Sequence, residues 1–307
     1  MGFDAVRVGA APVGSVLAAS LSDSSIQSCI RPYTPGGDIM AEALPLPIRI
    51  LVKGASTVGT ASPMGGPRTD FTFPRAIEAS LLAAGRPVEV RTISVASERT
   101  KDTLRHWERE MVGYSPDVVV LVYGHYETIH LMLPWWLERH ANSLRSRPGR
   151  IRERYRKVLL RPFWMSLAKL QAKLDTTLDP NIRKSRPLRV AADLEKLIGR
   201  IRFMHSPLVF VFELQPPAKR FRSWFPGMTA RMAVMNKTIA GMVERQDSPD
   251  IRYFRTTELI AEHAGGDLDL ATPDGFHYTP EMHRVIGTEL ATAIMEWADT
   301  QEHLKHG

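Results

Sequence analysis

The 307-residue sequence has a single cysteine, Cys29. One cysteine excludes an internal disulfide framework and provides no thiolate cluster for zinc, so a reducing, cytoplasmic compartment is the expectation. The sequence also lacks any run of 18 or more apolar residues, so no membrane-spanning helix is expected. These absences favour a globular protein that does not depend on disulfides, and they leave peripheral attachment to a membrane open.

The first 46 residues lack the periodicity of a helix or a strand and are rich in Gly, Ala, Ser and Pro. Their apolar run from Val8 to Leu21 has no basic n-region and no clear cleavage site, so it matches a secretory signal poorly. We expect residues 1–46 to form a disordered or extended leader outside the fold, and residues 301–307 to be a short tail.

Acidic residues are scarce in one segment of the chain. Residues 128–205 contain 18 Lys and Arg against 6 Asp and Glu, a charge of +12, whereas the remainder carries 22 against 27, or −5. The overall charge of +7 therefore belongs to this segment. An anionic acyl carrier such as CoA, or an anionic lipid surface, would suit it. Nucleic acid is not expected, because no binding motif is visible and the rest of the chain is acidic.

Strand-like apolar runs alternate with amphipathic stretches along the chain. The sequence predicts strands at 48–53, 88–93, 118–123, 208–214 and 251–255, and helices at 73–84, 100–113, 228–245 and 280–298. The run at 118–123 is continuously apolar, which is typical of strands covered on both faces in a parallel sheet. The predicted fold class is therefore α/β, with three α/β/α layers around a mostly parallel five-stranded sheet.

About 85 residues separate the third and fourth predicted strands, far more than a crossover requires. We therefore predict one domain over residues 47–300, with residues 128–205 a basic helical insertion. The insertion combines cations with aromatic residues, and a solvated helical face would explain that composition. A lid is the alternative, in which Trp135 and Trp136 line an acyl pocket and Arg139 holds an anionic group.

Asp274 and His277 are the most informative residues for function, since they stand three residues apart between the last predicted strand and the final helix. An aspartate at that spacing can orient and polarise an imidazole. Ser56 follows the first strand directly, and the carboxyl ends of parallel strands meet at one sheet edge. Ser56, His277 and Asp274 are therefore candidates for a catalytic triad. A helix-capping serine and a surface histidine are the alternative interpretation.

Two further polar segments follow predicted strands at the same edge. They are residues 92–100, which include Ser97, and Gly124-His125-Tyr126-Glu127. In this order the four segments resemble the SGNH (GDSL-type) hydrolase family, which has a flavodoxin-like fold. That family carries a G-D-S block, a Gly, a G-x-N-D/E block and a D-x-x-H block. The corresponding residues here are Gly54-Ala55-Ser56, Ser97, Gly124-His125-Tyr126-Glu127 and Asp274-Gly275-Phe276-His277.

The resemblance spans roughly residues 47–300 and implies acyl transfer through Ser56, with His277 as its base. It implies an oxyanion hole formed by Ser97, Tyr126 and Gly124, and it implies no metal or organic cofactor. Three departures stand out. Ala55 replaces the family's Asp, Ser97 replaces a Gly but keeps the backbone N–H, and Tyr126 replaces the Asn that donates to the oxyanion. Losing one such donor costs about 10²–10³ in rate.

The placement of the insertion is also similar to that in actinobacterial sugar octanoyltransferases of this superfamily. The main expectation is a serine-dependent carboxylic-ester hydrolase. An O-acyltransferase that moves an acyl group from CoA or a carrier to a sugar or alcohol is the first alternative. A non-catalytic binding module that keeps the fold is the second, and Ala55 and Tyr126 motivate it.

Two further patterns resemble functional motifs but carry little weight. His263 and Asp267 form an H-x-x-x-D string found in some CoA-dependent acyltransferases, although the Gly that follows it there is missing here. His277 and His283 could suggest a metal, but no third histidine or carboxylate stands at ligand spacing, so we expect no metal site.

Overall fold

The computed structural model describes residues 46–64, 68–96, 98–129, 137, 140, 144, 149–175 and 185–305. All of these residues belong to one compact unit, Ala43–Gly307. The predicted leader lies outside the described residues except for residue 46, and residues 306 and 307 of the predicted tail lie outside them as well.

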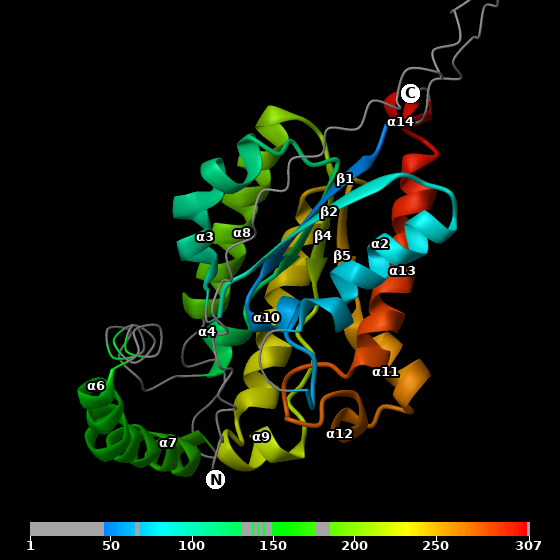
Figure 1. The fold of residues 1–307 in the computed structure, drawn as a ribbon. Helices are drawn as coiled ribbons and strands as arrows, with labels where there is room; N and C mark the ends of the chain where they lie inside the picture. The colour runs from blue at the N-terminus through cyan, green and yellow to red at the C-terminus, as the bar shows by residue number, and fades with distance from the viewer. Residues whose placement is uncertain are drawn as a thin grey trace, which may run out of the picture. The chain divides into compact units, whose positions relative to one another are not determined.

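The centre of the fold is a five-stranded sheet in the order β2-β1-β3-β4-β5, in which every neighbouring pair is parallel (Figure 1). Its strands are β1 Ile48–Gly54, β2 Val88–Ser94, β3 Val118–Val122, β4 Leu208–Phe212 and β5 Ile251–Phe254. All five predicted strands are present, and the predicted α/β class is confirmed. The sheet is parallel throughout, so the carboxyl ends of all its strands point the same way.

Helices cover both faces of the sheet, which gives three layers (Figure 1). One face packs against α2 Phe73–Ala83, α11 Thr256–Ala264 and α13 Pro280–Ala298. The other packs against α3 Thr100–Trp107, α8 Ser185–Met204 and α10 Met228–Arg245. Shorter elements complete the described chain: α1 Ser56–Gly59, η1 Thr69–Phe71, η2 Glu108–Val112, α4 His125–Ile129, α6 Arg150–Tyr155, η3 Arg156–Leu160, α7 Arg161–Asp175, α9 Lys219–Trp224, α12 Leu268–Ala271 and α14 Glu302–Lys305.

The apolar pattern of β3 explains its central place. All five residues of this strand are buried, and they alternate between the two cores. Val118, Val120 and Val122 pack into the core under α2 and α13, whereas Val119 and Leu121 pack into the core under α3 and α8. A strand with apolar side chains on both faces is stable only between two layers of helices.

The predicted fourth strand ends two residues earlier than expected. Leu214 donates its N–H to the side chain of Asn236 at 2.9 Å and accepts from the same amide at 2.8 Å. This side chain on α10 therefore replaces a neighbouring strand as the hydrogen-bond partner of the backbone. The predicted helix at 100–113 is α3 followed by the π-helical η2. The predicted helices at 73–84, 228–245 and 280–298 match α2, α10 and α13 to within one residue.

The long connection between β3 and β4 contains a helix of the central fold. α8 packs against α3 and α10 and contributes Leu194, Leu197 and Ile198 to the core of that face. It closes the crossover that a parallel β3–β4 pair requires. Among the described helices, none is both long enough and apolar enough to cross a membrane.

Candidate active site

The turn after β1 brings Ser56 to the carboxyl edge of the sheet. Gly54 ends the strand so close to β3 that a Cβ atom at this position would lie 2.6 Å from the carbonyl oxygen of Val122. The Ser94 hydroxyl, at the end of β2, donates to the carbonyl of Ala55 at 3.0 Å. Ser56 then begins α1, half-buried, on a turn attached to both neighbouring strands.

The loop before α13 brings Asp274 and His277 to the same edge. Gly275 has a φ of +99°, a region in which side chains are strained, and a Cβ there would meet the Phe221 ring. Thr279 caps α13 by accepting from the N–H of Met282 at 3.2 Å. The N–H of Asp274 donates to the Ser62 hydroxyl at 3.2 Å, which ties this loop to the segment after α1.

The three side chains form one continuous hydrogen-bonded chain. His277 Nε2 lies 2.9 Å from Ser56 Oγ, and His277 Nδ1 lies 2.7 Å from Asp274 Oδ2. The other carboxylate oxygen, Asp274 Oδ1, accepts from the backbone N–H groups of Phe276 at 2.9 Å and His277 at 2.8 Å. The carboxylate is therefore held on both oxygens, and residues 221 positions apart in the chain are in direct contact.

The charge state of Asp274 determines the direction of these hydrogen bonds. Burial raises the pKa of Asp274, but the hydrogen bonds and charge of His277 outweigh burial, and the net pKa is lowered. An ionised carboxylate only accepts, so His277 Nδ1 carries the proton. His277 Nε2 then has its lone pair toward Ser56 Oγ, which is the geometry in which an imidazole can take a hydroxyl proton.

A second group of buried side chains supports the His277 loop. Gln215 follows β4 and donates from Nε2 to the carbonyl of Phe276 at 2.8 Å. Its Oε1 accepts from the Tyr278 hydroxyl at 2.8 Å and lies 2.8 Å from His125 Nε2. The rings of His125 and Phe276 also meet edge to face, 4.9 Å apart. The residues on both sides of His277 are thus held in place from β3 and β4.

A model of a known protein family matches most of the chain. The model of the GDSL-like Lipase/Acylhydrolase family matches residues 54–285. The chain belongs to this family. The matched range begins at Gly54 and extends beyond His277, so it includes all three side chains of the hydrogen-bonded chain. No curated protein matches the sequence.

Solved structures of similar fold include a lipase/acylhydrolase and two esterases, all at low sequence identity. A lipase/acylhydrolase from Enterococcus faecalis has 13% identity and a TM-score of 0.52, covering 81% of this chain and 96% of its own. Est24, a carbohydrate acetylesterase from Sinorhizobium meliloti, has 13% identity and a TM-score of 0.51, with coverages of 81% and 99%. A variant of Axe2, an acetyl xylan esterase from Geobacillus stearothermophilus, has 14% identity and a TM-score of 0.51, with coverages of 80% and 94%. These likenesses support the SGNH fold.

The structure describes two of the three predicted oxyanion-hole residues. Gly124, with a φ of +111°, connects β3 to α4, and Tyr126 lies on α4, partly buried against the core. Ser97 lies outside the described residues. Glu127, the acidic residue of the same block, accepts from the N–H of Thr100 at 3.1 Å and so ties α4 to the start of α3. Burial raises the pKa of Glu127, although the hydrogen bond from Thr100 acts to lower it.

The structure describes Asp267 and His283 of the two further patterns, but not the predicted residues of the insertion. Trp135, Trp136 and Arg139 lie outside the described residues. Asp267 caps α12 by accepting from the N–H groups of Asp269 and Leu270, a structural role. His283 is fully buried, accepts from the N–H of Phe73 and donates to the carbonyl of Thr60, both at 3.2 Å. The described residues contain no cluster suited to a metal ion.

The sequence did not predict an ionic cluster around Lys53, three residues before Ser56. Lys53 is fully buried on β1, and its Nζ lies 3.2 Å from Glu98 Oε1 and 2.5 Å from Glu110 Oε2. The Tyr123 hydroxyl donates to Glu98 Oε2 at 3.1 Å and accepts from Thr103 at 2.6 Å. A lysine directly after the apolar run Ile50–Val52 was the available signal. The cluster anchors Glu98, in the connection between β2 and α3, to β1, the strand that precedes Ser56.

The two buried histidines predict a loss of stability in acid. Burial lowers the pKa of His125 to about 4, against the hydrogen bond with Gln215, and the charge of His277 lowers it further. Burial likewise lowers the pKa of His283 to about 4. Both have an ordinary pKa of 6.5, so the unfolded chain takes up these protons first as the pH falls. The free energy of unfolding should then fall by roughly 3 kcal/mol per histidine between pH 6.5 and 4.

Denaturant unfolding at a series of pH values measures this dependence. In His125→Gln the slope of unfolding free energy against pH should become shallower in that window, whatever the change in absolute stability. His263→Gln is the matched control, because that histidine is exposed, and it should keep the slope of the parent protein. A parent protein with a flat profile from pH 6.5 to 4 would contradict the prediction.

Proposed function

We propose that the protein is a serine-dependent carboxylic-ester hydrolase. The observation that carries this proposal is the hydrogen-bonded chain from Ser56 Oγ through His277 to Asp274, at 2.9 Å and 2.7 Å. Membership of the GDSL-like lipase and acylhydrolase family supports it. Esterases of the same fold also support a small-molecule ester as substrate.

In the first half of the reaction, Ser56 Oγ attacks the ester carbonyl while its proton passes to His277 Nε2. The imidazolium is stabilised by Asp274, whose lowered pKa keeps it ionised. Collapse of the tetrahedral intermediate breaks the bond to the alcohol oxygen, which receives the proton from His277. The products of this half are the free alcohol and an acyl group attached to Ser56.

In the second half, water gives a proton to His277 Nε2 and its oxygen attacks the acyl carbon. The serine leaves with that proton and the carboxylic acid is released. The backbone N–H groups of Ser56 and Ser97, together with Tyr126 and Gly124, are the proposed donors to the oxyanion. The chain's own residues supply every group in this scheme, so the proposed reaction uses no metal or organic cofactor.

Hydrolysis of short p-nitrophenyl esters tests the proposed activity. The purified protein should release p-nitrophenol in a saturable manner, with the same rate in the presence of EDTA. A folded protein that releases no p-nitrophenol above the rate of the buffer, across acetyl to octanoyl esters, would contradict the proposal. That result would favour the binding module instead.

An O-acyltransferase with the same triad is the second candidate function. The charge of +12 over residues 128–205 favours it, because an acyl-CoA donor is anionic. The acceptor discriminates between the two functions. With octanoyl-CoA and a sugar, a transferase should form sugar ester faster than free octanoate, whereas a hydrolase should form octanoate at the same rate with or without the sugar.

A further inference from the structure

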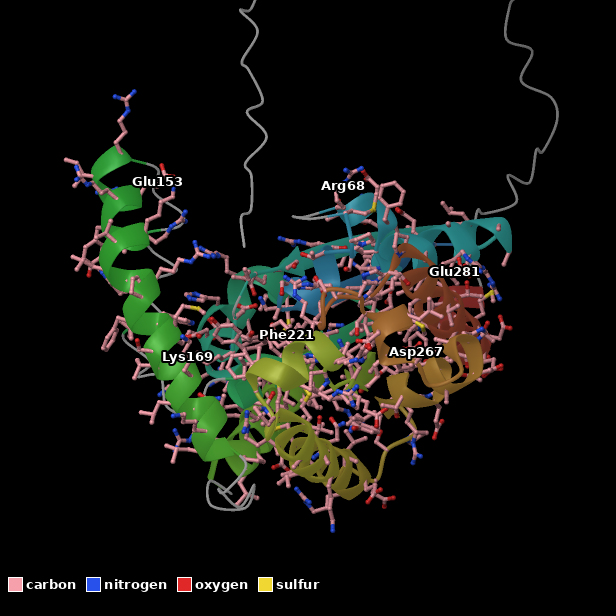
Figure 2. The ribbon with its side chains drawn as sticks, turned by 90° about the horizontal axis from the view of Figure 1, so that it is seen from below. Arg68, Glu153, Lys169, Phe221, Asp267 and Glu281 are labelled. Atoms are coloured by element: carbon pink, nitrogen blue, oxygen red, sulfur yellow. The ribbon has the colours of Figure 1, made fainter. Side chains whose placement is uncertain are left out.

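The helical segment from Arg150 to Asp175 combines exposed apolar side chains with a high positive charge. It consists of α6, the π-helical η3 and α7, which follow one another without a break. In Figure 2 it forms one continuous rod, on which Glu153 and Lys169 are labelled. Residues 150–175 contain eight Lys and Arg against two acidic residues, a net charge of +6.

One side of this helix packs against the rest of the chain. Leu160 is buried in a small core with Leu137, next to Trp164 and Leu167. Gln171 is also buried, and its Nε2 donates to the carbonyl of Ile129 at 2.9 Å. These contacts fix which side of the helix faces the chain.

The flank of the helix next to Leu160 exposes large apolar side chains at regular intervals. Ile151 is 87% exposed, Leu159 61% and Phe163 52%. Tyr155 lies between them in the sequence, 39% exposed, with its ring edge to face against that of His140. These positions are four residues apart. In an α-helix that spacing drifts by about 40° at each step, but the π-helical turn of η3 holds more residues and reduces the drift. The four side chains therefore lie along one side of the helix.

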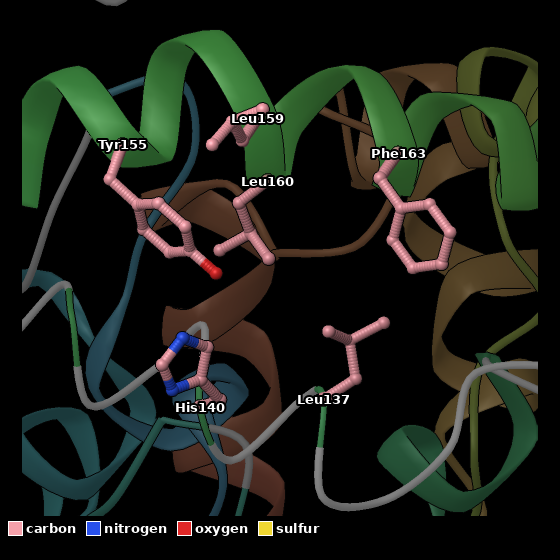
Figure 3. A pocket seen from close by; sticks show the side chains of 6 residues that line it. All are labelled: Leu137, His140, Tyr155, Leu159, Leu160 and Phe163. Carbon is pink, nitrogen blue, oxygen red and sulfur yellow. The ribbon is translucent and has the colours of Figure 1, made fainter.

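Tyr155, Leu159 and Phe163 form one wall of a hollow of about 630 Å³ (Figure 3). In Figure 3, Tyr155, Leu160 and Phe163 point from the helix toward Leu137 and His140 on the opposite wall. Apart from His140 and the Tyr155 hydroxyl, the lining is apolar. Such a space suits hydrocarbon chains better than a polar ligand.

We propose that the helix Arg150–Asp175 binds the surface of an anionic lipid bilayer. Ile151, Leu159 and Phe163 would enter the boundary between head groups and acyl chains, and the surrounding Arg and Lys side chains would contact lipid phosphates. Apolar residues on one side of a basic helix are the signature of interfacial binding, and a net charge of +6 complements an anionic surface. This binding is independent of the proposed ester hydrolysis.

The helix is connected to the candidate active site by direct packing. α7 contacts α9, and Phe221 of α9 packs against Phe276 with ring centroids 5.5 Å apart. Phe276 is the residue before His277. Binding to a bilayer would therefore bring the Ser56–His277 edge of the sheet close to the lipid surface.

Vesicle co-sedimentation of the full chain tests this proposal. Vesicles of phosphatidylcholine and phosphatidylserine in equal parts should bind the protein, and vesicles of phosphatidylcholine alone should bind it far more weakly. High salt should weaken the binding, because it screens exposed charges. Equal binding to both kinds of vesicle, or no binding to the anionic ones, would overturn the proposal.

Two surface variants and a matched control locate the binding face. The double variant Ile151→Asp with Phe163→Asp should lose at least about tenfold in vesicle affinity. A variant with Arg150, Arg154, Arg161 and Lys169 changed to Gln should lose about a hundredfold or more. Phe203→Asp is the control, since Phe203 is 92% exposed on α8, and its affinity should equal that of the parent protein. Circular dichroism shows whether each variant is folded.

Two further measurements separate this proposal from its alternatives. Ser56→Ala should bind anionic vesicles as the parent does, so a failure of ester hydrolysis leaves the binding result unaffected. Light scattering shows whether the apolar side joins two copies of the chain. A dimer that Ile151→Asp with Phe163→Asp converts to a monomer, in a protein that ignores anionic vesicles, would assign this face to a second copy and overturn the proposal.

Discussion

Ser56→Ala is expected to lower kcat for p-nitrophenyl ester hydrolysis by about 10⁴-fold or more, and to leave the fold unchanged. The substitution removes only the oxygen that lies 2.9 Å from His277 Nε2. Without this oxygen no acyl-enzyme can form, and the remaining groups can only polarise the ester for direct attack by water. The residue is half-buried at a turn, so the loss of one hydroxyl should change stability little.

The neighbouring residue provides a matched control. Thr57 is fully buried, and its hydroxyl has no hydrogen-bond partner within the part of the chain that the structure describes. Thr57→Val removes a hydroxyl one residue away, keeps the side-chain shape and should retain most of the activity. Steady-state kinetics of both variants with the same ester make the comparison. Similar kcat values for Ser56→Ala and the parent would remove Ser56 from the mechanism.

Lys53→Met is expected to destabilise the fold by about 3–5 kcal/mol, because it leaves buried carboxylates without their cation. Lys53 Nζ lies within 3.2 Å of Glu98 and 2.5 Å of Glu110. Burial already raises the pKa of Glu98, an effect that the charge and hydrogen bond of Lys53 only partly offset. Removal of the lysine raises this pKa further. The loss should therefore be smaller at pH 5 than at pH 8, since the carboxyls take up protons as the pH falls.

Denaturant unfolding at the two pH values measures this effect. Lys101→Met is the matched control, since Lys101 is exposed on α3, and it should change stability by less than about 0.5 kcal/mol. Adding Glu98→Gln and Glu110→Gln to Lys53→Met should restore much of the lost stability, because the buried charges are then gone together. If Lys53→Met unfolds with the parent's midpoint at both pH values, the cluster does not stabilise the fold.

The alternation of apolar runs with amphipathic stretches was sufficient to predict the five strands of the sheet. Continuous apolar runs such as Val118–Val122 are informative because a strand buried on both faces tolerates few polar residues. Parallel strands place their carboxyl ends together, which is why Ser56 after the first strand and His277 after the last could be paired from sequence. The structure brings these two side chains into contact.

The contacts that support the candidate site could not be predicted from the sequence. They join side chains that are far apart in the chain and that no sequence motif connects. Lys53 follows the apolar run Ile50–Val52 of β1, and nothing in the sequence shows that Glu98 and Glu110 face it. Gln215, which follows β4, supports the His277 loop, although the D-x-x-H motif gives no indication of this contact. Contacts of this kind depend on the register of the strands and the rotation of the helices.

The most direct test of the account is mass spectrometry after incubation with a serine-directed fluorophosphonate. A reactive hydroxyl requires that Ser56 Oγ, His277 and Asp274 act together, so the reagent should add to the peptide that contains Ser56. The label should be absent in Ser56→Ala and strongly reduced in His277→Ala. A folded protein that stays unlabelled, or one that is labelled at another residue, would contradict the proposal that Ser56 is the nucleophile.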